Sequence, residues 1–176
     1  IPRVEMGAEF ASGLAVAVGE HLPFRDASID VVMLNEVIEH VTDDSDTMRE
    51  VYRILKPGGS VVIYAPNRLY FFETHGVYLG KKYIFGNIPF VNWLPNPLRN
   101  RLVPHAREYT SRGIRAITKG LPFRTIEQSY VYPGFDNIVY RHKRLGPWLR
   151  RFFHMCEVTP LKYFGLSHFV VLRKPA

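Results

Sequence analysis

The sequence contains a single cysteine and no long uninterrupted apolar run, and both absences narrow the classes of protein to consider. Cys156 cannot form a disulfide within the chain, which fits a reducing cytoplasmic setting and disfavours a disulfide-rich secreted scaffold. The lack of an apolar stretch of about 18 residues leaves no candidate transmembrane helix. The first residues also lack a basic segment followed by an apolar one, so we expect no signal peptide there.

The sequence also has no glycine-rich loop of the kind that binds phosphates. Gly58 and Gly59 follow a helix-like run and precede a strand-like run, whereas phosphate loops follow a strand and open a helix. We therefore expect this pair to form a turn, with Gly58 in the left-handed conformation. Before Leu14 the glycines are Gly7 and Gly13, and they form no G-x-G-x-G motif.

The chain has 176 residues, 47% of them apolar, which is enough to build one domain with a hydrophobic core. Its net charge of +7 is unevenly spread. Residues 1–68 carry 6 Lys/Arg and 11 Asp/Glu, whereas residues 69–176 carry 17 and 5. The basic, aromatic second part is typical of a surface that meets an anionic partner; a solvated basic face is the plain alternative.

The first part of the chain has the pattern of alternating strands and helices. Uninterrupted apolar runs at residues 14–18 and 29–35 predict buried strands of a parallel sheet covered on both faces. Residues 42–56 predict a helix with an acidic start and Lys56 at its end, and residues 60–65 predict the next strand. This order of elements indicates an α/β fold.

The second part begins with a long segment, residues 69–105, in which aromatics, prolines and asparagines follow no period; such segments are usually functional or form a lid. A short helix is predicted at 110–120, with Thr110 or Ser111 as N-cap. Strands are predicted at 123–132 and 167–175. A helix at 144–156 would carry an apolar stripe, which is either core or a membrane-binding face.

Three segments taken together resemble the class I S-adenosylmethionine-dependent methyltransferases, in particular the type 11-like members. They are "GEHLPFRDASIDVVMLNEVIEHV", "MREVYRILKPGG" and "VVIYAPN". The resemblance implies a single Rossmann-like domain with a mostly parallel sheet and S-adenosylmethionine as cofactor. It implies a partial cofactor-side core at 1–68, an aromatic cap insertion at 69–109, and C-terminal helices and last strands at 110–176.

The resemblance also implies which residues would hold the cofactor. Val18, Gly19 and Glu20 correspond to the loop that contacts adenine; many relatives carry Asp at the position of Val18, so a side-chain contact would depend on Glu20. Asn35 and Glu36 would line the methionine end. In an open α/β sheet, ligands bind beyond the carboxyl ends of the strands, where these residues lie.

Methyl transfer needs an aligned nucleophile and, where that nucleophile is weak, a base. The candidate bases are His40, Glu73 and His75, with His105 as a further one. Each has a structural alternative: His40 could pack the start of a helix, and Glu73 and His75 could belong to a surface turn. The spacing of these last two with His105 matches no strong zinc pattern, so no metal is expected.

Asn67, His105 and Tyr109 follow the next expected strand and the cap, so they are the candidate acceptor-binding residues, although a tyrosine placed like Tyr109 more often belongs to the core. The sequence does not identify the methyl acceptor. The basic cap favours an anionic, lipid-linked or glycan acceptor.

The usual cofactor loop of the family has no counterpart here, so we expect a fragment of a longer methyltransferase that by itself binds the cofactor weakly or not at all. The alternative is an inactive module that binds a membrane surface, nucleic acid or a protein. Of these partners, an anionic membrane is favoured over nucleic acid, which would make a cytoplasmic protein peripheral to a membrane.

Overall fold

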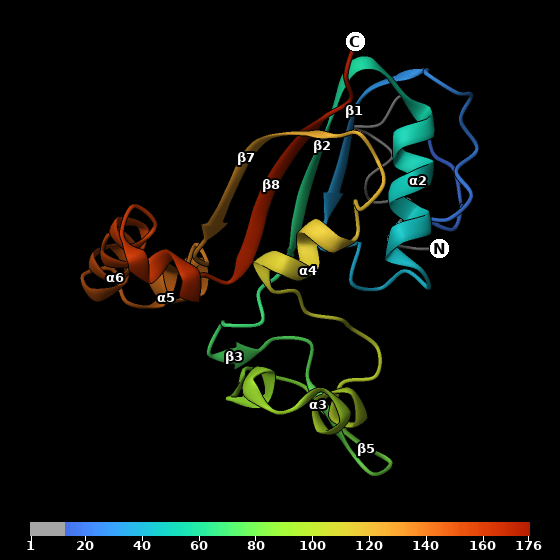
Figure 1. Cartoon of the computed structure of the whole chain (residues 1–176). Helices are drawn as coiled ribbons and strands as arrows, with labels where there is room; N and C mark the ends of the chain where they lie inside the picture. Colours follow the sequence, from blue (N-terminus) through green and yellow to red (C-terminus); the bar gives the residue numbers. More distant parts are fainter. Residues whose placement is uncertain (1–12) are drawn as a thin grey trace.

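The computed structural model describes residues 13–176, and its centre is a four-stranded sheet (Figure 1). The strands are β1 (Ile29–Asn35), β2 (Leu55–Pro66), β8 (Ser167–Arg173) and β7 (Arg124–Val131), in the order β1-β2-β8-β7. β1 and β2 are parallel, whereas β8 runs antiparallel to both of its neighbours. The α/β fold is as predicted, but the described sheet is mixed rather than mostly parallel.

Helix α2 (Asp44–Ile54) connects β1 and β2 and packs on one face of the sheet. The side chain of Asp43 caps its start by accepting a hydrogen bond from the amide of Asp46, and the acidic first turn suits the positive end of the helix dipole. Met48 and Val51 are completely buried against the strands. The predicted strand, helix and strand are therefore present.

The glycine pair lies in an irregularity of β2, where its register with β1 shifts, rather than in the expected turn; it is at the end of the sheet remote from β1's carboxyl terminus. Gly58 has a φ of 79°, in the left-handed region as predicted, and its amide donates to the carbonyl oxygen of Lys174. A Cβ on Gly59 would lie 2.9 Å from the carbonyl oxygen of Lys56, so the backbone approaches too closely for a side chain. Lys56 itself lies in β2 and pairs with Asp30, not at the helix end where we expected it.

The predicted strand at residues 14–18 is wrong. The segment runs as an exposed loop, with 94% of Val16 accessible, and bends back on itself at a single bridge between Val18 and His21. A strand needs a neighbouring edge to complete its hydrogen bonds, and no described strand pairs with this segment. β1 is also more exposed than expected, because the described helices that pack on it cover one face and leave Val31 and Met33 about 60% accessible.

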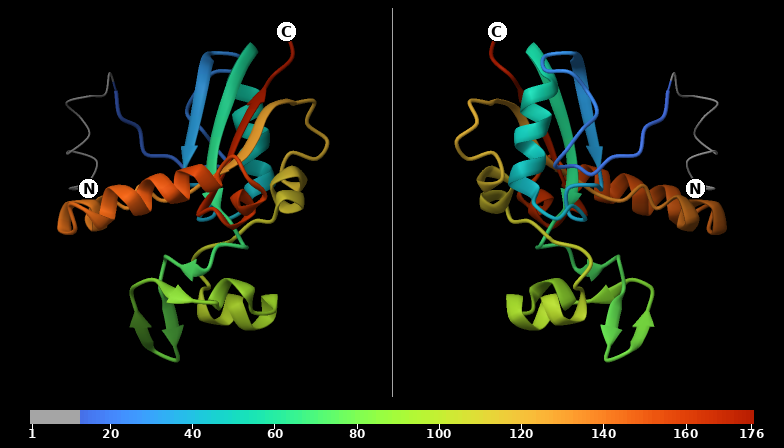
Figure 2. Two further views of the ribbon diagram at one scale, coloured as in Figure 1. Left: turned by 90° about the vertical axis from the view of Figure 1, so that its left-hand side faces the viewer. Right: turned by 90° about the vertical axis from the view of Figure 1, so that its right-hand side faces the viewer.

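The cap, which follows Asn67, is built from short helices and strands. The sequence predicted no regular secondary structure there. Its strands pair as two small sheets. The elements are β3 (Phe72–Glu73), β4 (Val77–Leu79), β5 (Lys82–Ile84), β6 (Ile88–Pro89), the 3-10 helix η2 (Val91–Trp93) and α3 (Asn96–Leu102). Val77, Val91, Val103 and Ala106 form a separate small core. The cap hangs from the carboxyl end of β2, beyond the sheet (Figure 2).

The C-terminal part begins with α4 (Ser111–Ala116), which Thr110 caps through the amide of Gly113, in agreement with the prediction. Two further helices and a 3-10 helix lie between β7 and β8. They are α5 (Asp136–Arg141), α6 (Leu145–Cys156) and η3 (Pro160–Phe164). Figure 2 shows α5 and α6 extending away from the sheet. Among the described residues, no helix combines the length and apolarity needed to cross a bilayer.

Candidate functional site

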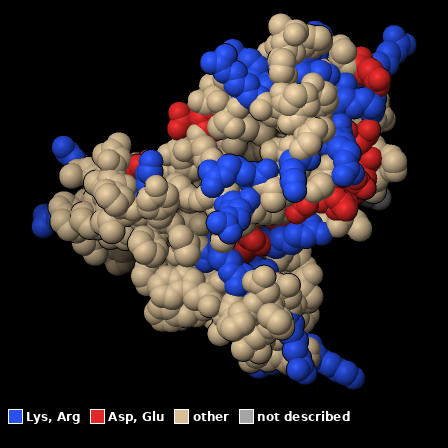
Figure 3. Space-filling model, viewed as in Figure 1, with Lys and Arg blue, Asp and Glu red and all other residues tan. Residues whose placement is uncertain are grey.

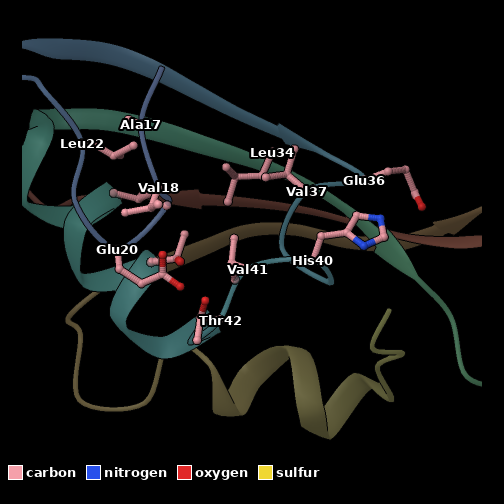
Figure 4. A pocket seen from close by; sticks show the side chains of 13 residues that line it. Ala17, Val18, Glu20, Leu22, Leu34, Glu36, Val37, His40, Val41 and Thr42 are labelled. Atoms are coloured by element: carbon pink, nitrogen blue, oxygen red, sulfur yellow. The ribbon is translucent and has the colours of Figure 1, made fainter. Parts of the chain in front are cut away.

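A cavity of about 500 Å³ opens beyond the carboxyl end of β1, where an α/β sheet normally binds its ligand. Figure 4 shows Glu36 and His40 at one end of this cavity and Val18 and Glu20 toward the other. The remaining lining residues are mainly apolar: Ala17, Gly19, Leu22, Leu34, Val37, Val41, Thr42, Thr47 and Val51. The cavity therefore has a polar end and an apolar body, which suits an amphipathic small molecule.

Four of the five residues expected at the cofactor line this cavity, and Asn35 does not. Gly19 permits a close approach of the loop to α2, because a Cβ there would lie 2.8 Å from Oγ1 of Thr47. Glu20 accepts a hydrogen bond from the amide of Asp43, and this bond lowers the pKa of its carboxyl. The loop before β1 is thus fastened to the start of α2, which shapes the cavity.

Glu36 and His40 come from the tight turn that follows β1. Glu36 has a φ of 53°, which is unusual for a residue with a side chain, and its carboxylate accepts a hydrogen bond from Oγ of Ser167 at 2.8 Å. His40 lies within hydrogen-bond distance of the cap: its Nδ1 is 2.9 Å from the carbonyl oxygen of His105. This contact joins the turn after β1 to the cap.

His75 lies beside His40 and is held by Glu73. The Nδ1 of His75 is 3.0 Å from Oε1 of Glu73, and this hydrogen bond raises the pKa of His75. His105 approaches the same group, with Nε2 3.2 Å from the carbonyl oxygen of His75. The structure therefore brings together His40, His75 and His105, which are far apart in sequence.

Glu73, one of the candidate bases, contacts both His75 and Arg99 from a buried position. Its side chain is completely buried and pairs with Arg99, at 3.0 Å from Oε2. Burial acts to raise the pKa of Glu73, but the hydrogen bond to His75 and the charge of Arg99 lower it to about 2. Arg99 also contacts Glu108 at 3.3 Å, and burial raises the pKa of Glu108 to about 8, so the two neighbouring carboxyls share one negative charge near neutral pH.

Glu39 is a site residue that the sequence analysis missed. It is 2% exposed, and neither of its carboxylate oxygens has a hydrogen-bond partner among the described residues. Burial raises its pKa to about 7. Its Oε1 lies 3.6 Å from Nε2 of His40 and 3.9 Å from Nε2 of His75. The available signal was its spacing: it stands three residues after Glu36 and directly before His40.

Two of the expected acceptor-binding residues have internal roles instead. The side-chain amide of Asn67 is buried and donates to the carbonyl oxygens of Tyr163 and Gly165. Tyr109 is buried in the main core, and its hydroxyl bonds the carbonyl of Ile38, which fits the core alternative. Burial also raises the pKa of Tyr109. Because these polar atoms are already engaged, they are unsuited to hold an acceptor; His105 is the exposed member of the three.

The model of a methyltransferase domain family matches residues 4–63, which include the cavity loop and the turn after β1. Over these residues the chain is similar to methyltransferase domains. A probable S-adenosylmethionine-dependent methyltransferase from Mycolicibacterium smegmatis is 46% identical over 50 residues, or 28% of this chain and 20% of the relative. A ubiquinone/menaquinone biosynthesis C-methyltransferase, UbiE, from Haemophilus ducreyi is 27% identical over 74% of this chain and 46% of the relative.

Solved structures of class I methyltransferases agree on the fold. An S-adenosylmethionine-dependent methyltransferase from Thermotoga maritima superposes with a TM-score of 0.58 at 20% identity, covering 97% of this chain and 68% of that one. The cyclase SpnF superposes with a TM-score of 0.56 at 15% identity, covering 99% and 63%. Since one of these neighbours is a cyclase, the methyltransferase fold alone does not fix the reaction.

The chain spans half or less of the length of the curated relatives described above. Residues 1–12, with Gly7, lie outside the described part, as does any cofactor contact they make. Within the described part, residues of the loop 17–22 and the turn 36–42 line the cavity.

Proposed function

We propose that this chain is the part of an S-adenosylmethionine-dependent methyltransferase that holds one side of the cofactor and carries the acceptor-binding cap. The observation that carries the proposal is the cavity of about 500 Å³ at the end of β1, lined by Gly19, Glu20 and Glu36. Its apolar body suits the adenine ring. The carboxylates of Glu20 and Glu36 suit the polar and cationic groups of the cofactor.

The reaction itself demands little acid or base chemistry. The acceptor's lone pair forms a bond to the methyl carbon while the carbon–sulfur bond breaks; sulfur keeps the electron pair, and the cofactor leaves as S-adenosylhomocysteine. The acceptor then loses a proton if it began with one. The protein contributes alignment and exclusion of water, for which a cap above the cofactor is suited.

His40 marks the acceptor side of the proposed site. It lines the cavity, yet its ring is also bonded to His105 at the start of the chain that leaves the cap. A carbonyl oxygen can only accept, so Nδ1 of His40 carries the hydrogen, and a neutral ring then presents the Nε2 lone pair. That lone pair is available to take a proton or a cation at the edge of the cofactor cavity.

The direct test is calorimetric titration of the chain with S-adenosylhomocysteine. We expect saturable binding, and the substitution Val37→Trp should weaken it about tenfold or more by filling the cavity from a half-exposed position. Val158→Trp, at an exposed position in the α6 region, is the matched control and should bind as the parent does. Absence of binding, or equal binding by both variants, would overturn the proposed cofactor site.

A second, apolar cavity of about 290 Å³ supports an acceptor with an aromatic or lipid part. Cap residues and residues of the α5 and α6 region line it together: Tyr70, Phe71, Phe72, Tyr132, Phe135, Phe153 and Phe164. Such a cavity favours apolar groups over a small polar acceptor. We therefore favour a lipid-linked acceptor among the classes that the sequence left open.

We further propose that α6 binds an anionic membrane surface. The predicted apolar stripe is exposed in part: Trp148 is 64% accessible and Phe152 46%, whereas Cys156 is buried, and Met155 beside the stripe is 59% accessible. Residues 136–163 carry six Lys/Arg and two Asp/Glu, so the surroundings are cationic. Figure 3 shows this lobe as mainly uncharged on one face with basic side chains at its rim. An amphipathic helix of this composition is suited to the headgroup region of a bilayer.

A further inference from the structure

Three atoms that ordinarily accept hydrogen bonds face one another at the junction between the turn after β1 and the cap. They are Oε1 of Glu39, Nε2 of His40 and Nε2 of His75, and all lie within 4.8 Å of one another. The oxygen is 3.6 Å from one ring nitrogen and 3.9 Å from the other. These separations are too long for hydrogen bonds, so a proton alone would not bridge the atoms well.

The partners of the two rings determine which nitrogen carries the hydrogen. Nδ1 of His40 lies 2.9 Å from the carbonyl oxygen of His105, and a carbonyl can only accept. Nδ1 of His75 lies 3.0 Å from the carboxylate of Glu73, which is held ionised by Arg99. Both Nδ1 atoms are therefore donors. In the neutral rings the Nε2 atoms are left with lone pairs directed at Glu39.

The buried carboxylate of Glu39 is energetically unfavourable unless a positive charge lies among the three atoms. Its side chain is 0% exposed, and neither oxygen accepts a hydrogen bond from the described residues. A buried carboxylate without a partner loses its hydration without compensation. A cation among the three atoms would supply that compensation in a single interaction.

We propose that Glu39, His40 and His75 bind a divalent metal cation. Two imidazole nitrogens and one carboxylate oxygen form a donor set that suits first-row ions such as Mn²⁺, Co²⁺ or Zn²⁺. Bonds of about 2.0 to 2.2 Å place neighbouring ligand atoms about 3.4 Å apart. The two separations from Oε1 of Glu39, 3.6 and 3.9 Å, need to shorten by only a few tenths of an ångström, and the ring nitrogens, within 4.8 Å of each other, approach as the exposed His40 ring adjusts.

The groups around the three ligands are arranged as a metal site requires. Histidine ligands normally donate their second ring nitrogen to a carboxylate or a carbonyl, which fixes the ring and its tautomer. Here Glu73 performs this role for His75 and the carbonyl of His105 performs it for His40. Arg99 in turn fixes Glu73 from a buried position.

The site has an open side. His40 is 44% exposed and also lines the cofactor cavity, so a cation bound to its Nε2 would lie at the edge of that cavity. Three protein ligands leave positions for water or for an oxygen of the acceptor. On the assumption of the proposed methyl transfer, such a cation would orient an acceptor hydroxyl and help it to lose its proton. The ion would act only as a Lewis acid, so its oxidation state would not change.

The test is titration of the whole chain with Mn²⁺ followed by electron paramagnetic resonance, and with Co²⁺ followed by visible absorption. We expect one equivalent to bind and to raise the midpoint of thermal unfolding. Glu39→Gln keeps the shape of the side chain but removes the charge, and should weaken binding about tenfold or more. Glu127→Gln, at an exposed position on β7, is the matched control and should bind like the parent.

The outcomes separate the metal site from methyl transfer, because neither ion titration requires the cofactor. Absence of stoichiometric ion binding by the folded chain would overturn the cation site, whatever the result with S-adenosylhomocysteine. Unchanged binding by a folded Glu39→Gln variant would overturn the ligand assignment; His75→Gln supplies a second test should that variant fail to fold. Ion binding without S-adenosylhomocysteine binding would instead count against the proposed cofactor cavity alone.

Discussion

Nδ1 of His40 lies 2.9 Å from the carbonyl oxygen of His105, 65 residues further along the chain. The contact connects the turn after β1, which borders the cofactor cavity, to the end of the cap. It also sets the tautomer of His40, because the carbonyl oxygen requires a hydrogen on Nδ1. A residue of the cap therefore determines which nitrogen of His40 keeps its lone pair.

We predict that the neutral form of the His40 ring carries its hydrogen on Nδ1. Long-range ¹H–¹⁵N spectra of the histidine side chains distinguish a nitrogen that carries a hydrogen from one with a lone pair, so they read the tautomer directly. The Nε2 resonance should be of the lone-pair type and should shift on addition of Zn²⁺. An Nε2–H tautomer for His40 would contradict the hydrogen bond to the cap.

Replacing Arg99 by Met should destabilise the chain by about 3 to 5 kcal/mol, because it leaves the buried carboxylate of Glu73 without its cation. The free energy of unfolding in urea measures this. Arg101→Met, at an exposed position in the same helix, is the control and should change stability by about 0.5 kcal/mol or less. A loss of less than about 1 kcal/mol for Arg99→Met would mean that the network contributes little.

The pair of Glu50 and Arg53 should make stability fall in acid. Hydrogen bonds from Arg53 lower the pKa of Glu50 to about 2 from its usual 4.5. A lowered pKa in the folded state gives stability that is present above about pH 4.5 and is lost as the pH falls toward about 2. The parent minus Glu50→Gln difference in unfolding free energy should shrink across that interval. A difference that stays constant from pH 5 to pH 2.5 would refute the linkage.

Trp148 should enter the headgroup region of anionic vesicles. In a Trp93→Phe background its fluorescence should shift to the blue with vesicles of phosphatidylglycerol and phosphatidylcholine, and less so at high salt. Trp148→Ala should weaken vesicle binding about tenfold, the effect of losing one buried aromatic side chain. Trp93→Ala, an exposed tryptophan of the cap, should not. Binding to RNA without binding to vesicles would contradict the proposed membrane surface and favour nucleic acid as the partner.

Gly58 and Gly113 should respond to alanine in opposite directions. Gly58→Ala should destabilise the chain by about 1 to 2 kcal/mol, because its φ of 79° is unfavourable for a residue with a Cβ. Gly113→Ala should stabilise it by about 0.5 to 1 kcal/mol, because the new Cβ inside α4 meets nothing closer than 3.6 Å. Thermal unfolding of both variants decides this, and equal effects would show that backbone conformation is not the cause.

The sequence alone predicted the elements whose signals are local. Thr110 caps a helix as predicted, the acidic residues indicated the start of the helix that follows Asp43, and the left-handed conformation of Gly58 follows from its place after a helix. The strand predicted from the apolar run at 14–18 was wrong, because a strand also requires a neighbouring strand edge, and that is not a local property of the sequence.

The tertiary structure decided which side chains meet and which stay exposed. Glu39 gave no signal beyond its spacing, and its importance arises from two histidines that reach it from the turn and from the cap. Trp148 belongs to a stripe that fits a core as well as a surface, and only the projection of α6 away from the sheet leaves it exposed. Periodicity and helix capping depend on residues that are neighbours in the sequence. The burial of a side chain and its contacts depend on the path of the whole chain.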